Sequence, residues 1–141
     1  RLQWPVRDRR AGYEQSLSVL EQVARESDIY TKTSLMLGVG EYHHEIWQTL
    51  SDLAEIDLDI VTLGQYLQPS LTHLDVERYV HPDEFDTWRD VAEQEFEFLY
   101  CASGPMVRSS YKAGELFVDA VLRDGKSVEE AREAARSVAS D

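Results

Sequence analysis

Apolar residues recur at the spacing of a helix in three stretches of the chain. Tyr13, Leu17, Leu20 and Val23 follow at intervals of four, three and three residues, which predicts a helix over residues 13–25. The same spacing predicts a helix over 42–55 and another that begins at Pro82, a residue suited to a first helical turn. Their apolar faces are Ile46, Leu50, Leu53 and Phe85, Trp88, Val91, Ala92.

Three short apolar runs, over residues 31–37, 59–63 and 96–102, alternate with those helices. Each run ends at glycine or at a turn-forming segment, which is typical of a buried strand. Apolar strands that alternate with amphipathic helices indicate a parallel sheet. The sequence therefore predicts an α/β fold with three parallel strands and flanking helices.

Three parallel strands are too few to close a barrel and leave a raw sheet edge, which natural folds cover or pair. The pattern therefore predicts a partial, TIM-like (β/α) barrel, of which this chain is the C-terminal half. We expect residues 1–118 to form that half and residues 119–141 to form a helical tail, with helical pieces over 115–122 and from Ser127, whose capping-box partner is Glu130. The chain begins at Arg1 rather than Met, so we expect it to be processed or a piece of a longer protein.

The charge balance excludes several classes of partner. The chain has 14 basic and 27 acidic residues, a net charge of −13, which argues against nucleic acid and against an anionic membrane surface. No apolar run could span a bilayer and no secretory signal is visible, so we expect a cytoplasmic protein. The basic residues are 11 Arg and 3 Lys; scarce lysine with acidic excess predicts a salt-adapted protein, and an ordinary acidic surface is the alternative.

Cysteine and histidine offer little metal chemistry. Cys101 is the one cysteine of the sequence, which excludes an internal disulfide framework and an all-cysteine metal site. Its place inside the third predicted strand favours a buried, inert thiol over a redox role. The His43-His44-Glu45 run lacks the spacing of a zinc motif, so we expect a solvated helix face there.

The segments that follow the three strands are unusually polar or glycine-rich. They span residues 38–41, 64–70 and 103–111. In parallel α/β folds, binding and catalytic sites gather at the carboxyl ends of the strands. The sequence therefore predicts a site built from these three loops.

The same loops carry a family resemblance. TKTSLMLGVGE (31–41), TLGQYLQPSLTHLDVERYVHPDEFD (62–86) and ASGPMVRSSYKAGE (102–115) closely resemble the C-terminal half of lipoyl synthase, a radical S-adenosylmethionine enzyme. The resemblance covers residues 1–118. It implies that the intact enzyme inserts two sulfurs into an octanoyl chain, using S-adenosylmethionine and two 4Fe–4S clusters, one of which is consumed as sulfur donor. Neither cysteine motif of the family is present, so we expect this chain alone to hold no complete cofactor and to be inactive.

The resemblance also implies roles for particular residues. The family's glycine-rich pattern after the strand corresponds to residues 34–41, with Ser34 in place of a glycine and Met36 in place of an isoleucine. The alternatives for these positions are a strand-to-helix turn, a loop that packs a helix on the sheet, and a serine pair that caps a turn. The implied set is Ser34, Met36, Gly38, Gly40, Glu41, Gln65 and Gln68 for the cofactor, Tyr66 and Arg108 for the substrate, and Ser110, with Ser109 as the fallback, for iron of the auxiliary cluster.

The implied partners are octanoylated lipoyl-carrier domains, namely those of 2-oxoacid dehydrogenases and the H protein of glycine cleavage, and an upstream half-barrel. Two other interpretations stay open at this point. The chain could be a non-catalytic half-barrel that binds carrier proteins, or one half of a split enzyme.

Overall fold

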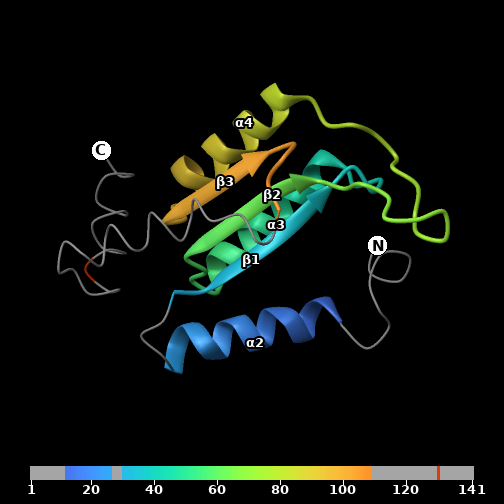
Figure 1. Ribbon diagram of the computed structural model, residues 1–141. Helices are drawn as coiled ribbons and strands as arrows, with labels where there is room; N and C mark the ends of the chain where they lie inside the picture. The colour runs from blue at the N-terminus through green and yellow to red at the C-terminus, as the bar shows by residue number, and fades with distance from the viewer. Residues whose placement is uncertain (1–11, 27–29, 109–129, 131–141) are drawn as a thin grey trace.

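The computed structural model describes residues 12–26, 30–108 and 130. The chain runs through the helix α2 (Tyr13–Glu26), β1 (Lys32–Leu37), α3 (His43–Glu55), β2 (Ile60–Gln65), α4 (Pro82–Asp90), the π-helical turn η1 (Val91–Glu95) and β3 (Tyr100–Gly104). The strands form one parallel sheet in the order β1-β2-β3 (Figure 1). The predicted α/β fold with three parallel strands is therefore confirmed, whereas a partial barrel stays a prediction.

One face of the sheet packs against the helices and forms the core. Strand alternation puts Leu37, Val61, Leu63 and Cys101 on this face. They join the buried side chains of α3 and α4, and Leu17 and Leu20 of α2 pack against the same cluster. The helical residues of this core are Ile46, Leu50, Leu53, Phe85 and Trp88, as the apolar spacing predicts.

Past its first row, the opposite face of the sheet carries mostly small residues. Ser34, Thr62 and Ala102 lie side by side across the three strands, and the Thr62 hydroxyl donates a hydrogen bond of 2.6 Å to Ser34 Oγ. The next row toward the carboxyl ends is Met36, Gly64 and Gly104. Two of these three positions have no side chain, so backbone forms much of this face near the strand ends.

The third strand begins four residues later than the sequence predicts, at Tyr100 instead of residue 96. Phe96 and Phe98 donate backbone hydrogen bonds back to Val91 and Ala92, which closes the helix end. Glu97 between them has a positive φ of 59°, which ends the helical path. The rings of Phe96 and Phe98 pack into the core, and their backbone does not pair with β2. The prediction that the strand begins at residue 96 is therefore wrong. The predicted end of the second strand is also corrected, since β2 continues through Gln65.

The starts of β1 and β2 are tied together by a buried carboxylate. Asp59 Oδ2 accepts hydrogen bonds from the backbone N–H of Thr31 at 2.8 Å and from its hydroxyl at 3.2 Å. This end of the sheet is therefore closed by polar contacts, and the candidate site lies at the other end. The predicted tail helices lie outside the described residues apart from Glu130. No helix within the described ranges has the length and apolar character needed to cross a membrane.

Candidate functional site

The turn that follows β1 is held closed by its own glutamate. Gly38 and Gly40 have φ of 100° and 103°, a conformation that glycine adopts without strain. The chain can therefore fold back so that Glu41 Oε1 accepts from the Gly38 N–H at 2.8 Å and Oε2 from the Val39 N–H at 2.9 Å. The Glu41 side chain is only 8% exposed. The carboxylate thus uses both oxygens to fix the turn 38–41.

Residues 77–80 pass against this turn and are fixed by the last residue of β2. The buried Gln65 amide donates to the carbonyls of Tyr66 and Arg78, at 2.9 and 3.1 Å, and its Oε1 accepts from the Val80 N–H at 2.8 Å. The Glu77 N–H donates to the Gly38 carbonyl at 2.8 Å. The predicted cofactor residue Gln65 therefore joins the end of β2 to the returning end of the loop, and the Glu77 N–H joins that segment to the turn 38–41.

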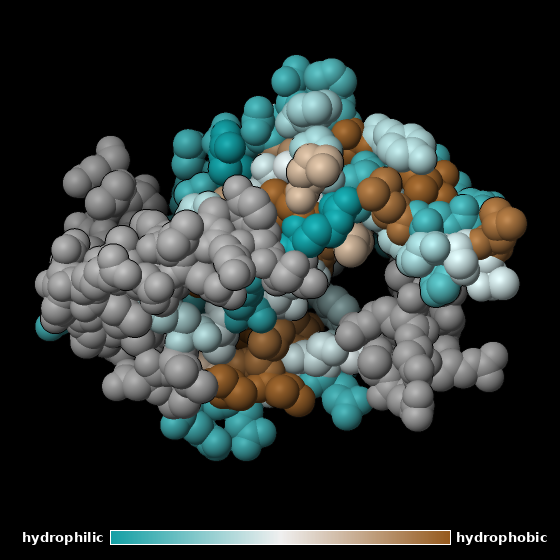
Figure 2. Space-filling view, viewed as in Figure 1, coloured by the Kyte–Doolittle hydropathy of each residue, from teal (hydrophilic) through white to brown (hydrophobic). Residues whose placement is uncertain are grey.

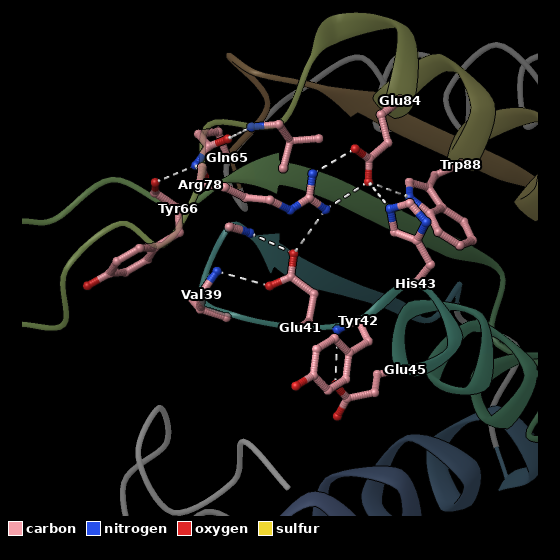
Figure 3. A network of polar contacts seen from close by, with 12 residues as sticks. Val39, Glu41, Tyr42, His43, Glu45, Gln65, Tyr66, Arg78, Glu84 and Trp88 are labelled. Carbon is pink, nitrogen blue, oxygen red and sulfur yellow. Dashed lines mark hydrogen bonds and ion pairs between the residues drawn. The ribbon is translucent and has the colours of Figure 1, made fainter.

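The side chain of Arg78 connects this segment to α4. Its guanidinium binds both carboxylate oxygens of Glu84, at 2.7 and 2.8 Å, and lies 3.8 Å from Glu41 Oε1 (Figure 3). Trp88 Nε1 also donates to Glu84 at 3.3 Å, and His43 Nε2 lies 3.2 Å from the same carboxylate. The hydrogen bonds that Arg78 donates lower the pKa of Glu84 to about 2, and the same bonds, accepted by the Glu84 carboxylate, raise the pKa of Arg78. The pair is therefore ionised at neutral pH.

Between these anchors, the loop 66–75 lies exposed. The Tyr66 hydroxyl donates to the Leu74 carbonyl at 2.8 Å, and the Gln68 amide donates to the His73 carbonyl at 2.9 Å and to Asp75 at 3.1 Å. Figure 2 shows hydrophobic side chains on the surface where this loop lies, and its exposed leucines are Leu67, Leu71 and Leu74. The donor groups of Tyr66 and Gln68 thus brace the loop internally.

The segment after β3 closes over the end of β2. The Arg108 Nη1 donates to the carbonyls of Val107, Pro105 and Gln65, at 2.9, 3.2 and 3.4 Å. A Cβ on Gly64 would collide with the Val107 carbonyl, so only glycine permits this close approach. Arg108 therefore links the ends of two strands. Its predicted substrate contact remains a prediction, and Ser109 and Ser110 lie outside the described residues.

The structure brings Gly38, Gly40, Glu41 and Gln65 together at the carboxyl edge of the sheet. Ser34 and Met36 lie on the face away from the core, and Met36 is exposed. The pairing of Arg78 with Glu84 was not predicted from the sequence. The available signal was the pair of opposite charges on either side of Pro82.

Cys101 is buried, as its position in the sequence predicts, and burial raises the pKa of its thiol to about 12. His43 and His44 are exposed, although His43 also lies edge-on to the Trp88 ring at 5.9 Å between centroids. Over the described part of the chain, no group of three or more His, Cys, Asp or Glu residues could hold a metal ion.

No family model matches the sequence. It is 77% identical over all 141 residues to a protein of Halobacterium salinarum named lipoyl synthase, and 73% identical over the same length to the lipoyl synthase of Halorubrum lacusprofundi. The chain belongs to the lipoyl synthase family. The mitochondrial lipoyl synthase of the fungus Podospora anserina is 60% identical over 121 residues, or 84% of the chain.

The match covers only part of each relative. The chain spans 45% of the Halobacterium and Halorubrum lipoyl synthases and 28% of the Podospora protein. This share agrees with the resemblance to the C-terminal half of lipoyl synthase. The expected division at residue 118 stays a prediction.

Proposed function

We propose that this chain is the C-terminal half of the partial barrel of a lipoyl synthase, and that the intact enzyme inserts two sulfurs into the octanoyl chain of lipoyl-carrier proteins. The observation that carries the proposal is the identity of 77% to a lipoyl synthase over all 141 residues. Every loop at the carboxyl edge of the sheet falls within this match. The proposal thus assigns a function to the edge where the turn 38–41, the loop 66–80 and Arg108 meet.

The residues at this edge fit S-adenosylmethionine. Ser34 and Met36 lie on the face away from the helices, and Val107 packs over the neighbouring positions Gly64 and Gly104. The exposed Met36 thioether and the fixed turn at Gly40 are therefore the parts of this edge that could contact the cofactor. Gln65 and Gln68 complete the proposed cofactor set, Gln65 by holding the loop in place. When bound, S-adenosylmethionine supplies the hydrogen abstraction that opens an unreactive C–H bond to sulfur.

The described residues do not fit an iron–sulfur cluster. Such clusters are held by several thiolates, and the sequence contains one cysteine, which is buried in the core. The described residues alone therefore carry out no chemistry on a cluster. The proposed contribution of the chain is one ligand, the hydroxyl of Ser110 or otherwise Ser109, to the auxiliary cluster of the intact enzyme.

Octanoylated carrier domains are the proposed substrates, with Tyr66 and Arg108 on the substrate side of the site. A strand of the upstream half-barrel would pair with the β1 edge of the sheet. The proposed location is a cytoplasm of high salt, because acidic excess with scarce lysine is tolerated best where salt screens charge repulsion.

The test uses a chimera in which this chain replaces the matching residues of the Halobacterium salinarum lipoyl synthase. The unsubstituted chimera should convert an octanoylated carrier to a lipoylated one when iron and sulfide are restored without oxygen. Ser110→Ala should abolish lipoyl formation and leave release of 5′-deoxyadenosine intact, because the radical cluster has its own ligands. Ser109→Ala should be milder. Mass spectrometry of the carrier measures lipoyl formation, and chromatography measures the 5′-deoxyadenosine that is released.

Each outcome decides a different point. An unsubstituted chimera that folds and forms no lipoyl group would reject the proposed function and favour a binding module. Loss of activity in Ser109→Ala but not in Ser110→Ala would assign the iron ligand to Ser109 instead of Ser110. Full activity in both variants would reject a ligand role for either hydroxyl.

A further inference from the structure

Contacts from three different elements hold the segment 77–80 in place. The Glu77 N–H donates to Gly38 after β1, and the Gln65 side chain at the end of β2 binds the backbone of Arg78 and Val80. The Arg78 guanidinium binds Glu84 in the first turn of α4. The end of the loop is therefore fixed relative to β1, β2 and α4 together, while the middle of the loop is exposed to solvent.

We propose that Arg78 is a positioning residue that sets the loop 66–75 relative to the turn 38–41. It binds both oxygens of Glu84 and lies 3.8 Å from Glu41, whose carboxylate closes the turn. A planar guanidinium can donate two hydrogen bonds to Glu84 and still lie close to Glu41, whereas a lysine would supply one point charge. This inference rests on the proposed function, in which the turn lies beside S-adenosylmethionine and the loop carries Tyr66, which is assigned to the substrate side.

The consequence concerns coupling between cofactor cleavage and product formation. Arg78 contacts carboxylates of this chain, and its effect on the reaction is exerted through the two segments that it joins. A misplacement of about 1 Å between reacting groups can slow a reaction about 100-fold. If the loop shifts relative to the turn, the cofactor is cleaved without an octanoyl carbon in place. Removing the Arg78 contacts should therefore increase the amount of S-adenosylmethionine that is cleaved for each lipoyl group formed.

The test measures how many molecules of 5′-deoxyadenosine the chimera releases for each lipoyl group formed. A merely structural role leaves this ratio unchanged, because a smaller folded fraction lowers both quantities equally. Arg78→Gln should raise the ratio about tenfold, as expected for a displacement of less than an ångström. Arg78→Lys should give an intermediate ratio. The matched control is Arg89→Gln, which removes an arginine that pairs with Asp86 and Asp90 on the exposed side of α4.

The outcomes separate the inference from the proposed function. If the unsubstituted chimera is active and Arg78→Gln keeps its ratio, the positioning role is rejected and the proposed function stands. An unsubstituted chimera without lipoyl formation rejects both. Should Arg78→Gln fail to fold, Glu84→Gln removes the charge from the other side of the pair with little change of shape. Its ratio must then rise above that of Arg89→Gln, and an equal ratio rejects the inference.

Discussion

Gly38 and Gly40 share an unusual backbone conformation but differ in the space around them. Both have positive φ, which costs an alanine about 1–2 kcal/mol. A Cβ on Gly38 would also lie 2.5 Å from the Arg78 carbonyl and from Gln65 Nε2, whereas a Cβ on Gly40 would meet only Glu77 Cγ at 3.5 Å. The Gly38 position therefore adds a steric conflict with the anchored segment to the backbone strain.

We predict that Gly38→Ala lowers the free energy of unfolding by about 3 kcal/mol and Gly40→Ala by about 1 kcal/mol. The extra loss at Gly38 comes from the displacement of the Arg78 carbonyl and the Gln65 amide. Urea unfolding of the two variants beside the unsubstituted chain measures both losses. Equal losses would show that the segment 77–80 moves aside freely, which would contradict the tight anchoring described above.

Single residues also show how far the sequence could predict the site. The family resemblance implied roles for Gly38, Gly40 and Glu41, and a turn after the apolar strand was predictable from the glycines. The pairing of Arg78 with Glu84 was not, since both residues had other credible uses. Glu84 is favourable at any helix start, and an arginine in a polar loop is ordinarily solvated. Only the path of the chain around Pro82 brings the two together.

At the scale of elements, the start of α4 is joined to the site by the ionised Glu84. Hydrogen bonding to Arg78 holds the pKa of Glu84 at about 2, below the ordinary value of 4.5. Glu41 and His43 are the other titratable groups near this pair. The folded state therefore binds fewer protons than the unfolded state between these two pH values. The resulting stabilisation is complete above about pH 4.5 and is lost as the pH falls toward 2.

Glu84→Gln should accordingly be less stable than the unsubstituted chain at pH 7, and the difference should shrink between pH 4.5 and 2. Urea unfolding at a series of pH values provides the measurement. Asp86→Asn is the control, because Asp86 is an exposed residue of the same helix with one surface ion pair, at 3.4 Å. A Glu84→Gln difference that is constant with pH would mean that the ion pair does not hold α4 to the site.

The elements themselves were predictable to different degrees. The helices α2 and α3 begin and end within a residue of the ranges predicted by apolar spacing. The start of β3 was wrong, because an apolar run with two phenylalanines suits either a strand or the end of a buried helix. Tertiary packing decided between them, through the approach of Phe96 to Trp47 at 5.1 Å between ring centroids. No local signal predicts the π-helical turn η1.

At the scale of the whole molecule, the alternation of strands and helices was enough to predict a parallel sheet. Each crossover contains a helix or a long segment, and the strands are adjacent in chain order. The curvature that would make this sheet part of a barrel depends on strands from elsewhere. For that reason the parallel sheet is observed, whereas the partial barrel is proposed.

Net charge is the remaining property of the whole molecule, and it leads to a prediction about salt. At a net charge of −13, carboxylates on the surface repel one another. The distance over which this repulsion acts becomes shorter as the salt concentration rises. We expect the unfolding midpoint to rise by about 5–10 °C between about 0.1 and 2 M KCl, a gain of about 1–2 kcal/mol. Circular dichroism on heating measures it, in KCl because sulfate would stabilise by exclusion from the surface.

A charge-reduced variant separates screening from a general effect of salt. Glu14, Glu55, Glu95 and Glu97 are exposed, and replacing all four by their amides makes the net charge four units less negative. If repulsion is the cause, this variant should be more stable at low salt and should gain less from KCl. An unfolding midpoint of the unsubstituted chain that does not change with KCl would reject salt adaptation and leave an ordinary acidic surface. An equal rise of the midpoint in both proteins would do the same.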